Sequence, residues 1–444
     1  MKTETASSTE PKVVVRAYYM ISGLYSLSAS LIWGVNTLFL LNAGLNIFEV
    51  FIANAVFTGS MALFEIPTGV LADSRGRRHS FLLSVVVLMV GTLGYVGTAA
   101  AGGGLLMFSL MGVVLGLGYT FYSGAVEAWL VDALAATGYV GEKDRVFARG
   151  SMVWSAAMLV GTIGGGLLGT LDLALPFVVR AGLLVGVFVV AWFTMHDLGF
   201  EPRAVSTSEL PAEMRRIARS SVQYGWRKRS VRLLIGASAF HSLFMAWGFW
   251  AWQPYFLDLL GRNAPWITGV IAALIALSTI AGNSLVEFAT RVCGKRTTLM
   301  LWASIVLSVA VIGVGLANSF WAAVGLYLLS MGAAGVYGPV RQAYLHQVIP
   351  SEQRATVISF DSLVGSGSST VGQTGLGYLA RAQSIEFGYV FGGLTTVLAL
   401  PVVWLLRSMN EDADRIVGAA GKQGPCAPAG LPEVTTVDPA ARTA

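Results

Sequence analysis

Apolar residues run through this chain in long stretches, and short polar segments between them hold most of the charge. A helix needs about 20 mainly apolar residues to cross roughly 30 Å of hydrocarbon. By this measure the pattern predicts twelve spans, at 17–41, 47–71, 80–100, 105–131, 150–170, 176–196, 232–256, 266–290, 298–317, 320–345, 355–380 and 386–407. The predicted fold class is an all-α membrane protein with twelve transmembrane helices.

A longer polar segment after the sixth span divides the apolar pattern into two sets of six. We therefore predict a cytoplasmic N-terminal arm, a six-helix bundle, a cytoplasmic linker, a second six-helix bundle and a disordered cytoplasmic tail, at 1–16, 17–197, 198–230, 231–408 and 409–444. The linker is basic, which suits either an amphipathic helix on an anionic membrane surface or a solvated connection. The tail is rich in Ala, Gly, Pro and Thr, a composition typical of disorder.

Composition and charge support the membrane interpretation. Hydrophobic residues make up 55% of the chain and charged residues 12%, about half the usual charge of a soluble domain. The net charge of +5 does not indicate nucleic acid, because the basic residues lie in loops between apolar spans. They gather in the N-terminal arm and in alternate loops: Lys2, Lys12, Arg16, Arg75, Arg77, Arg78, Lys143, Arg145, Arg149, Arg291, Lys295 and Arg296. The opposite side holds only Arg180, Arg262 and Arg381. The positive-inside rule then predicts a multi-pass protein of the inner (plasma) membrane with both termini cytoplasmic.

The loop after the second span carries the most specific motif of the chain. It is the segment Gly69-Val-Leu71-Ala-Asp73-Ser-Arg75-Gly76-Arg77-Arg78. Gly76 permits a tight turn, Gly69 permits close approach of another helix, and Asp73 ends the span beside a cluster of arginines. In sequence and position the segment resembles the loop motif Gly-x-Leu-Ala-Asp-x-x-Gly-Arg-Arg/Lys of the major facilitator superfamily of secondary transporters.

The resemblance implies two pseudo-symmetric six-helix halves that move against each other by alternating access. It also implies that Asp73 and Arg77 join an acid at the end of the fourth helix, here Asp132, in a cytoplasmic charge cluster that latches the outward-open state. No phosphate-binding loop, metal-ligand cluster or catalytic triad emerges from the sequence, so we expect no enzyme, no cofactor and no metal site.

Weak internal repeats relate the two predicted halves. The loop after the eighth span keeps Gly294-Lys295-Arg296 but has no equivalent of Asp73. In the fourth and tenth spans, Gly124-Ala-Val-Glu127 aligns with Gly338-Pro-Val-Arg341. These two helices line the central cavity in the family, so the alignment predicts that Glu127 faces Arg341 across it.

Charged and titratable residues inside spans are costly unless they are paired or hydrated, which makes each a functional candidate. Four of them are our candidates for proton coupling or gating: Glu65, Glu127, Arg341 and His241. The alternative for each is a structural hydrogen bond or ion pair. Asp361 and Glu287 lie nearer the ends of their spans and are expected to be capping or interfacial groups.

Aromatic side chains in the first, fourth and seventh spans suggest an apolar binding cavity. The candidates for its lining are Trp33, Asn36, Tyr119, Tyr122, Phe244 and Trp247. The alternative is that many of these rings face lipid or fill the core. In the fifth span, Gly161, Gly165 and Gly169 form a stripe for close helix packing, without the Gly-Pro pair of the related antiporter pattern.

The function we expect is proton-coupled export of drug-like or secondary-metabolite molecules, as in the drug and metabolite efflux branch of the family. The first alternative is proton-coupled uptake of a small organic nutrient. The second is a receptor or scaffold that has lost transport. The expected partners are a small-molecule substrate, protons and the lipid bilayer, with no nucleic acid, and the expected state is a monomer.

Overall fold

The computed structural model describes residues 10–200, 228–349 and 354–416. Within these ranges the regular structure is helical, and the one β-bridge pairs Lys295 with Arg415. Most of the predicted linker and most of the predicted tail lie outside the described residues, as do residues 1–9 of the arm.

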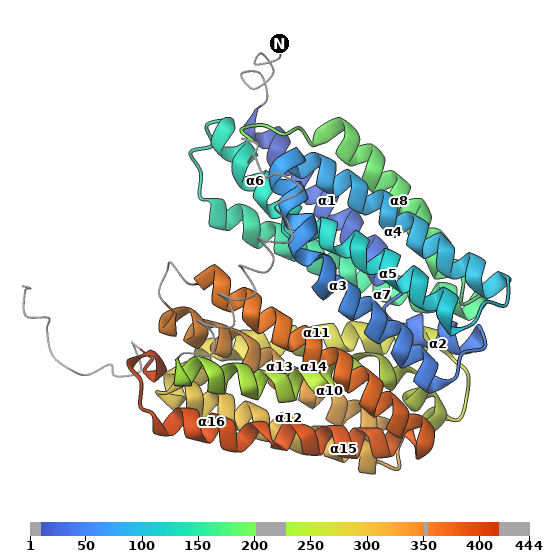
Figure 1. The fold of residues 1–444 in the computed structure, drawn as a ribbon, viewed down its shortest axis with the longest axis vertical. Coiled ribbons are helices and arrows are strands. Elements are labelled where there is room, and N and C mark those ends of the chain that lie inside the picture. Colours follow the sequence, from blue (N-terminus) through green and yellow to red (C-terminus); the bar gives the residue numbers. More distant parts are fainter. Residues whose placement is uncertain (1–9, 201–227, 350–353, 417–444) are drawn as a thin grey trace, which may run out of the picture.

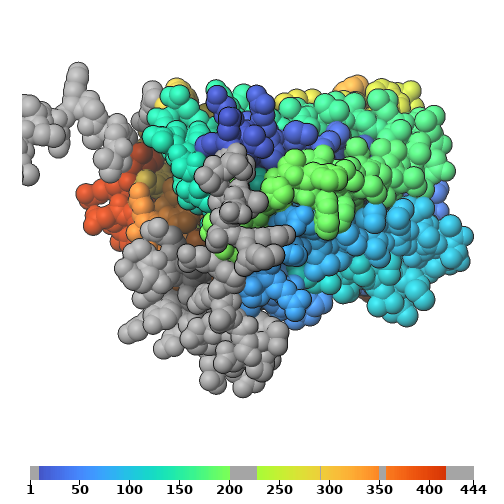
Figure 2. All heavy atoms as spheres, turned by 90° about the horizontal axis from the view of Figure 1, so that it is seen from above, coloured from blue at the N-terminus to red at the C-terminus, as the bar shows by residue number. Residues whose placement is uncertain are grey.

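The first half of the chain forms one helical bundle. Its helices are α1 (Pro11–Ser30), α2 (Asn36–Asn42), α3 (Ile47–Arg75), α4 (Arg77–Ala100), α5 (Leu105–Tyr122), α6 (Ala125–Ala136), α7 (Lys143–Leu171) and α8 (Leu175–Thr194). Figure 2 views this N-terminal half from its outer side, where α1, α4 and α8 lie next to one another. Large apolar side chains are exposed on α4 and α8, among them Val90 and Phe193, as expected of a surface that faces lipid.

The second half forms a second bundle, drawn below the first in Figure 1. Its helices are α10 (Arg229–Leu260), α11 (Pro265–Cys293), α12 (Arg296–Leu316), α13 (Phe320–Val348), α14 (Arg354–Ala382), α15 (Ile385–Val397), α16 (Ala399–Ser408) and the short 3-10 helix η2 (Asp412–Asp414). Each half has its own buried core, so the chain folds as two packed bundles.

Ten helical segments among the described residues are long and apolar enough to cross a membrane. Each of the pairs α5–α6 and α15–α16 counts as one such segment. The remaining two predicted spans correspond to α1 with α2 and to α14, which carries many Ser, Gly and Thr residues. All twelve predicted spans are thus helical and packed in the bundles, although two of them fall short of the apolarity of a typical span.

The fourth span is broken in the middle, which the apolar pattern does not show. Gly124 separates α5 from α6 and has a φ of +71°, a left-handed backbone that favours glycine. The break places Glu127 in the first turn of α6, where a carboxylate is stabilised by the free amides and the dipole of the helix.

Among the described residues, the two halves pack against each other toward one end of the molecule (Figure 1). We call this the closed end; it includes α2 and the start of α11 (Figure 1). There the Thr37 amide donates to Gln253 Oε1 at 2.9 Å, and Gln253 Nε2 donates to the Trp33 carbonyl at 2.9 Å. Gly166 of α7 also lies directly against Gly269 of α11.

At the opposite end, where α1 begins and α16 stops, the two ribbons diverge (Figure 1). We call this the terminal end. The molecule is therefore held in a conformation closed at one end and parted at the other.

Candidate functional site

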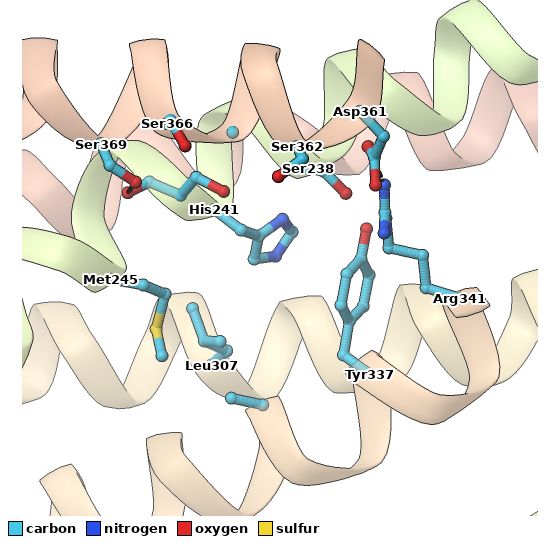
Figure 3. A pocket seen from close by; sticks show the side chains of 13 residues that line it. Ser238, His241, Met245, Leu307, Tyr337, Arg341, Asp361, Ser362, Ser366 and Ser369 are labelled. Carbon is cyan, nitrogen blue, oxygen red and sulfur yellow. Dashed lines mark hydrogen bonds and ion pairs between the residues drawn. The ribbon is translucent and has the colours of Figure 1, made fainter. Parts of the chain in front are cut away.

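A polar cavity of about 450 Å³ lies between α10, α13 and α14 of the C-terminal half. We call it the serine pocket. Figure 3 shows its lining, which consists of Ser238, His241, Ser242, Met245, Leu307, Ala334, Tyr337, Arg341, Asp361, Ser362, Gly365, Ser366 and Ser369. Hydroxyl groups, one imidazole and one ion pair converge there, a combination suited to binding a polar group.

Arg341 and Asp361 form an ion pair at one side of the serine pocket (Figure 3). Their side chains are only 12% and 17% exposed, so the pair is largely withdrawn from solvent. The prediction that Arg341 faces Glu127 is wrong for this conformation, because Arg341 is paired within its own half. Asp361 is likewise not the capping or interfacial group that we expected.

His241 lies on α10 in the same pocket. Its Nδ1 is 2.9 Å from the Ala237 carbonyl, one turn earlier on the helix, and its ring stacks on Tyr337 at 4.6 Å between centroids. These two contacts set the ring orientation. The Nε2 atom is buried without a hydrogen-bond partner. Its hydrogen-bonding capacity is therefore unused in this conformation, and the role of His241 in proton coupling or gating stays a prediction.

The serine face of α14 was missed by reasoning from apolar pattern and charge. Ser362, Ser366 and Ser369 follow each other at intervals of four and three residues, which places them on one face of the helix. A membrane span with so many hydroxyl groups on one side indicates a polar cavity. That periodicity was present in the sequence and is the signal that would have located the serine pocket.

Two cavities with aromatic walls lie nearer the closed end, where α10 meets the N-terminal half. One of about 240 Å³ is lined by Ile32, Trp33, Asn36, Asn54, Phe57, Met61, Tyr95, Leu115, Tyr119, Arg180, Phe249 and Trp250. The other, of about 320 Å³, is lined by Trp33, Trp154, Ser155, Met158, Phe249, Trp252, Ala272, Ile275, Ala276, Thr279 and Ile280. We call them the first and the second aromatic cavity.

Only part of the predicted cavity lining is found there. Trp33, Asn36 and Tyr119 line the first aromatic cavity. Tyr122 instead stacks on Tyr25, with ring centroids 3.9 Å apart.

Phe244 and Trp247 are fully buried and pack on Tyr389 in the core of the C-terminal half. The prediction that they line the cavity is a misassignment in this conformation, because their side of α10 points into the bundle.

Glu65 and Glu127 are both exposed and belong to the N-terminal half. Glu65 is seven residues beyond Thr58, so both lie on one face of α3. Thr58 accepts a hydrogen bond from Gln373 of α14 at 3.0 Å, which shows that this face points to the C-terminal half. Glu65 thus stands on the facing surface of α3, where the two halves begin to part.

The loop motif ties α3 and α4 to the end of α8. Arg77 forms an ion pair with Asp73, and the Arg78 guanidinium donates to the Trp192 carbonyl at 2.9 Å and covers its ring. Gly76 has a φ of +107°, and a Cβ there would lie 2.5 Å from the Asp197 carboxylate.

Two other members of the predicted latch are not engaged in this conformation. No ion pair joins Asp132 to the motif among the described residues, and a Cβ added to Gly69 would meet nothing within 4 Å.

The second, degenerate loop obtains its carboxylate from a distant part of the chain. Asp414, the last residue of η2, accepts from the Thr297 amide and from its hydroxyl, both at 2.7 Å. In the N-terminal half, Asp197 accepts from the Arg78 amide at 2.8 Å in the same way. Each half thus caps its third span with an acid that follows its sixth.

The glycine stripe of α7 lies against α1. A Cβ would approach Ser30 from Gly161, the Leu31 carbonyl from Gly165 and Val35 from Gly169. Among described residues, no group of three or more His, Cys, Asp or Glu side chains is arranged to hold a metal ion.

Known proteins resemble this chain in sequence and in fold. The family model described as Major Facilitator Superfamily matches residues 18–289 and 267–436. An uncharacterized MFS-type transporter, YxaM of Bacillus subtilis (strain 168), is 22% identical over 398 residues, which cover 87% of this chain and 94% of that protein.

Solved structures with the same fold include transporters of different substrates. The nucleoside transporter NupG aligns with a TM-score of 0.72 at 10% identity, over 89% of this chain and 99% of that one. A POT family transporter in complex with 5-aminolevulinic acid gives a TM-score of 0.68 at 13% identity, over 89% and 95%. The family match over most of the chain, together with the two helical bundles and the cavities between their helices, shows that this membrane protein belongs to the major facilitator superfamily and is a transporter, not an enzyme.

Proposed function

We propose that the protein is a proton-driven exporter of amphiphilic drug-like or secondary-metabolite molecules. The observation that carries this proposal is one face of α10. Ser238, Ser242, Met245 and Phe249 follow at intervals of four, three and four residues and thus share that face. The first three line the serine pocket, and Phe249 lines both aromatic cavities.

A molecule lying along this face of α10 meets hydroxyl groups at one end and aromatic rings at the other. Apolar walls with a few well-placed polar groups are typical of small-molecule sites. The aromatic rings favour a flat or apolar body, and the serine pocket favours a polar head. This combination supports an amphiphilic substrate over a sugar, which would need hydroxyl partners on all sides.

Protons are the proposed driving ion. Asp361 is held in the membrane-spanning region by Arg341, and protonation of the carboxylate would remove the charge that neutralises the guanidinium. His241, Glu65 and Glu127 stay further candidates, because each is a titratable group in or beside the region between the halves. A change at any of them alters the balance of charges that a rocking motion must bring together or separate.

The proposed orientation places the terminal end in the cytoplasm. The positive-inside rule supports it, since Arg75, Arg77 and Arg78 lie at that end. The conformation described above is then the inward-facing one, and the exporter would load its substrate from the cytoplasmic side in this state.

Uptake of a small polar nutrient is the second candidate, and the serine pocket is the observation that favours it. Hydroxyl groups with an adjoining ion pair also suit a solute that is polar throughout. NupG, which shares the fold, is a nucleoside transporter. Proton-coupled uptake by the present protein would differ from the proposed export in the direction of net flux.

The test is accumulation of fluorescent amphiphilic dyes of either charge in cells that carry the protein. We expect less dye in these cells than in cells carrying Asp361→Asn, and we expect collapse of the proton gradient to remove the difference. Greater accumulation in cells with the unchanged protein would indicate uptake and contradict export.

A further inference from the structure

Arg180 is a buried arginine without a carboxylate partner. It lies on α8 about a turn and a half from the closed end, and its side chain is 1% exposed. The sequence pattern places it near the outer end of the predicted span 176–196, and in the structure it lies in the wall of the first aromatic cavity. No acidic side chain lines that cavity.

The contacts that Arg180 does make leave its charge uncompensated. Nη2 is 3.4 Å from the Tyr119 hydroxyl, at the limit of a hydrogen bond, and the guanidinium lies 5.9 Å from the centre of the Tyr119 ring. Its Nε atom is buried with no hydrogen-bond partner. No ion pair joins it to an acid in the described part of the chain. A buried guanidinium is costly when unpaired, so such residues usually mark a place where an anion binds.

Two amides add further donors to the same cavity. Asn54 and Asn36 are 4% and 6% exposed, and Asn36 Nδ2 is 3.5 Å from Asn54 Oδ1. That arrangement directs the Asn54 amide nitrogen away from Asn36, and Asn54 Nδ2 has no hydrogen-bond partner. The cavity thus contains two buried donors, Arg180 Nε and Asn54 Nδ2, that lack acceptors.

The rest of the cavity wall is aromatic or aliphatic. Trp33, Phe57 and Trp250 line the cavity together with Arg180 and Asn54, and the volume of the cavity is about 240 Å³. An acceptor that brings negative charge and a flat apolar body matches both parts of the wall, because a carboxylate pairs with a guanidinium through charge-assisted hydrogen bonds while a ring packs on aromatic side chains.

We propose that Arg180 and Asn54 bind the carboxylate of an aromatic organic acid in the first aromatic cavity. This inference rests on the proposed function, since it makes the acid a substrate class of the exporter. The carboxylate lies at Arg180, and the ring lies between Trp33 and Phe57. A matched molecule with a neutral amide in place of the carboxylate keeps the ring contacts and loses the charge pairing.

The test is thermal stabilisation of the purified full-length protein by benzoate, naphthoate and indole acetate, each compared with its primary amide. We expect the acids to bind at least tenfold more tightly than the amides. Arg180→Gln should reduce acid binding at least tenfold and leave amide binding unchanged, and Arg180→Lys should retain part of the preference. Arg262→Gln, at an exposed arginine that lines none of the three cavities, is the matched control and should keep the full preference for acids.

A second variant keeps the proposal testable if Arg180→Gln fails to fold. Asn54→Asp supplies a carboxylate on the wall of the same cavity, so we expect it to raise the melting temperature and to abolish the response to acids. Equal binding of acids and amides, acid binding that survives Arg180→Gln, or no binding of any probe would each overturn the proposal. Dye export measured in parallel distinguishes the Arg180 site from the proposed export function. Export without acid binding would reject only the Arg180 site, and acid binding without export would reject only the export function.

Discussion

At the scale of single residues, the buried charges differ in whether a neighbouring helix supplies a partner: Asp361 pairs with Arg341, whereas Arg180 Nε has no hydrogen-bond partner. Arg341 was recognised as an unusual charge in a span, yet its partner is Asp361 of the next span and not Glu127 of the other half. Arg180 counts in the sequence only as one of three basic residues on the outer side, and the pattern does not show that it lines a cavity. The rotation and tilt of the helices decide which charged side chains form pairs. The spacing of residues along one helix determines neither the rotation nor the tilt.

The Arg341–Asp361 pair gives the first prediction. Removing one partner leaves a charge with 12% to 17% exposure unpaired, and the loss of stability is about 2 kcal/mol, discounted for partial exposure. We therefore expect Asp361→Asn and Arg341→Gln each to lower the melting temperature of the purified protein. The double variant should recover most of it, because no lone charge is left. Additive losses in the double variant would contradict a direct pairing.

Glu127 gives the second prediction. It lies in the first turn of α6 and is exposed, so its removal costs the fold little. We expect Glu127→Gln to abolish proton-coupled transport while the amount of protein in the membrane stays the same. Dye export driven by an imposed pH gradient in proteoliposomes measures this, with Glu142→Gln in the exposed loop as the control. Unchanged export by Glu127→Gln would remove Glu127 from the coupling mechanism.

At the scale of elements, the apolar pattern located the spans well and their internal features poorly. The break at Gly124 lies inside a predicted apolar span. Hydropathy does not reveal it, because a glycine has the same hydropathy whether its backbone is left-handed or not. The serines of α14 lower the hydropathy of that span, and hydropathy alone does not show that they share one face of the helix. Asp414 was assigned to a disordered tail, because only tertiary contact shows that it caps α12.

Asp414 gives a prediction about the end of the C-terminal half. Its carboxylate is 2% exposed and accepts two hydrogen bonds from Thr297, each worth about 1 kcal/mol or more for a charged acceptor. We expect Asp414→Ala to lower the melting temperature by several degrees. Asp412→Ala, two residues earlier in η2 and exposed, is the matched control and should change it little. Equal effects of the two substitutions would show that Asp414 has no special part.

The contact between α3 and α14 predicts how the terminal end closes. Phe51 lies beside Gly377 and Thr58 beside Gln373, so the two helices run in opposite directions along this contact. If this contact continued toward the terminal end, Glu65 on the same face of α3 would meet the serines of α14. In a protein without native cysteines, we expect Glu65→Cys and Ser366→Cys to cross-link only when the terminal end closes. Leu63→Cys with Ser366→Cys is the control, because Leu63 points away from that face.

At the scale of the whole molecule, the sequence predicted two related halves and the structure adds how they meet. The motif resemblance was sufficient for the family. It did not indicate that Gly166, at the position where the related antiporter pattern has proline, would touch the other half. That contact joins α7 to α11 at the closed end and has no signature within either helix alone.

We predict that the close contact at Gly269 influences the balance between the two conformations. A Cβ there would lie 2.6 Å from the Thr162 carbonyl and 2.8 Å from the Gly166 Cα, and backbone atoms cannot move aside as a flexible side chain does. We expect Gly269→Ala to open the closed end and to favour the opposite conformation, in which the terminal end is shut. Gly236→Ala on α10 is the control, since a Cβ there would meet nothing within 4 Å.

Labelling of single cysteines reports the shift. Cysteine at Thr37, which is buried at the closed end, should react faster with a membrane-impermeant reagent in the Gly269→Ala background, and cysteine at Glu65 should react more slowly. The two changes must occur together, because rocking of rigid halves about the central cavity exposes one end only by covering the other. Faster reaction at Thr37 without slower reaction at Glu65 would mean local loosening of the closed end, and the two halves would then not move as rigid bodies.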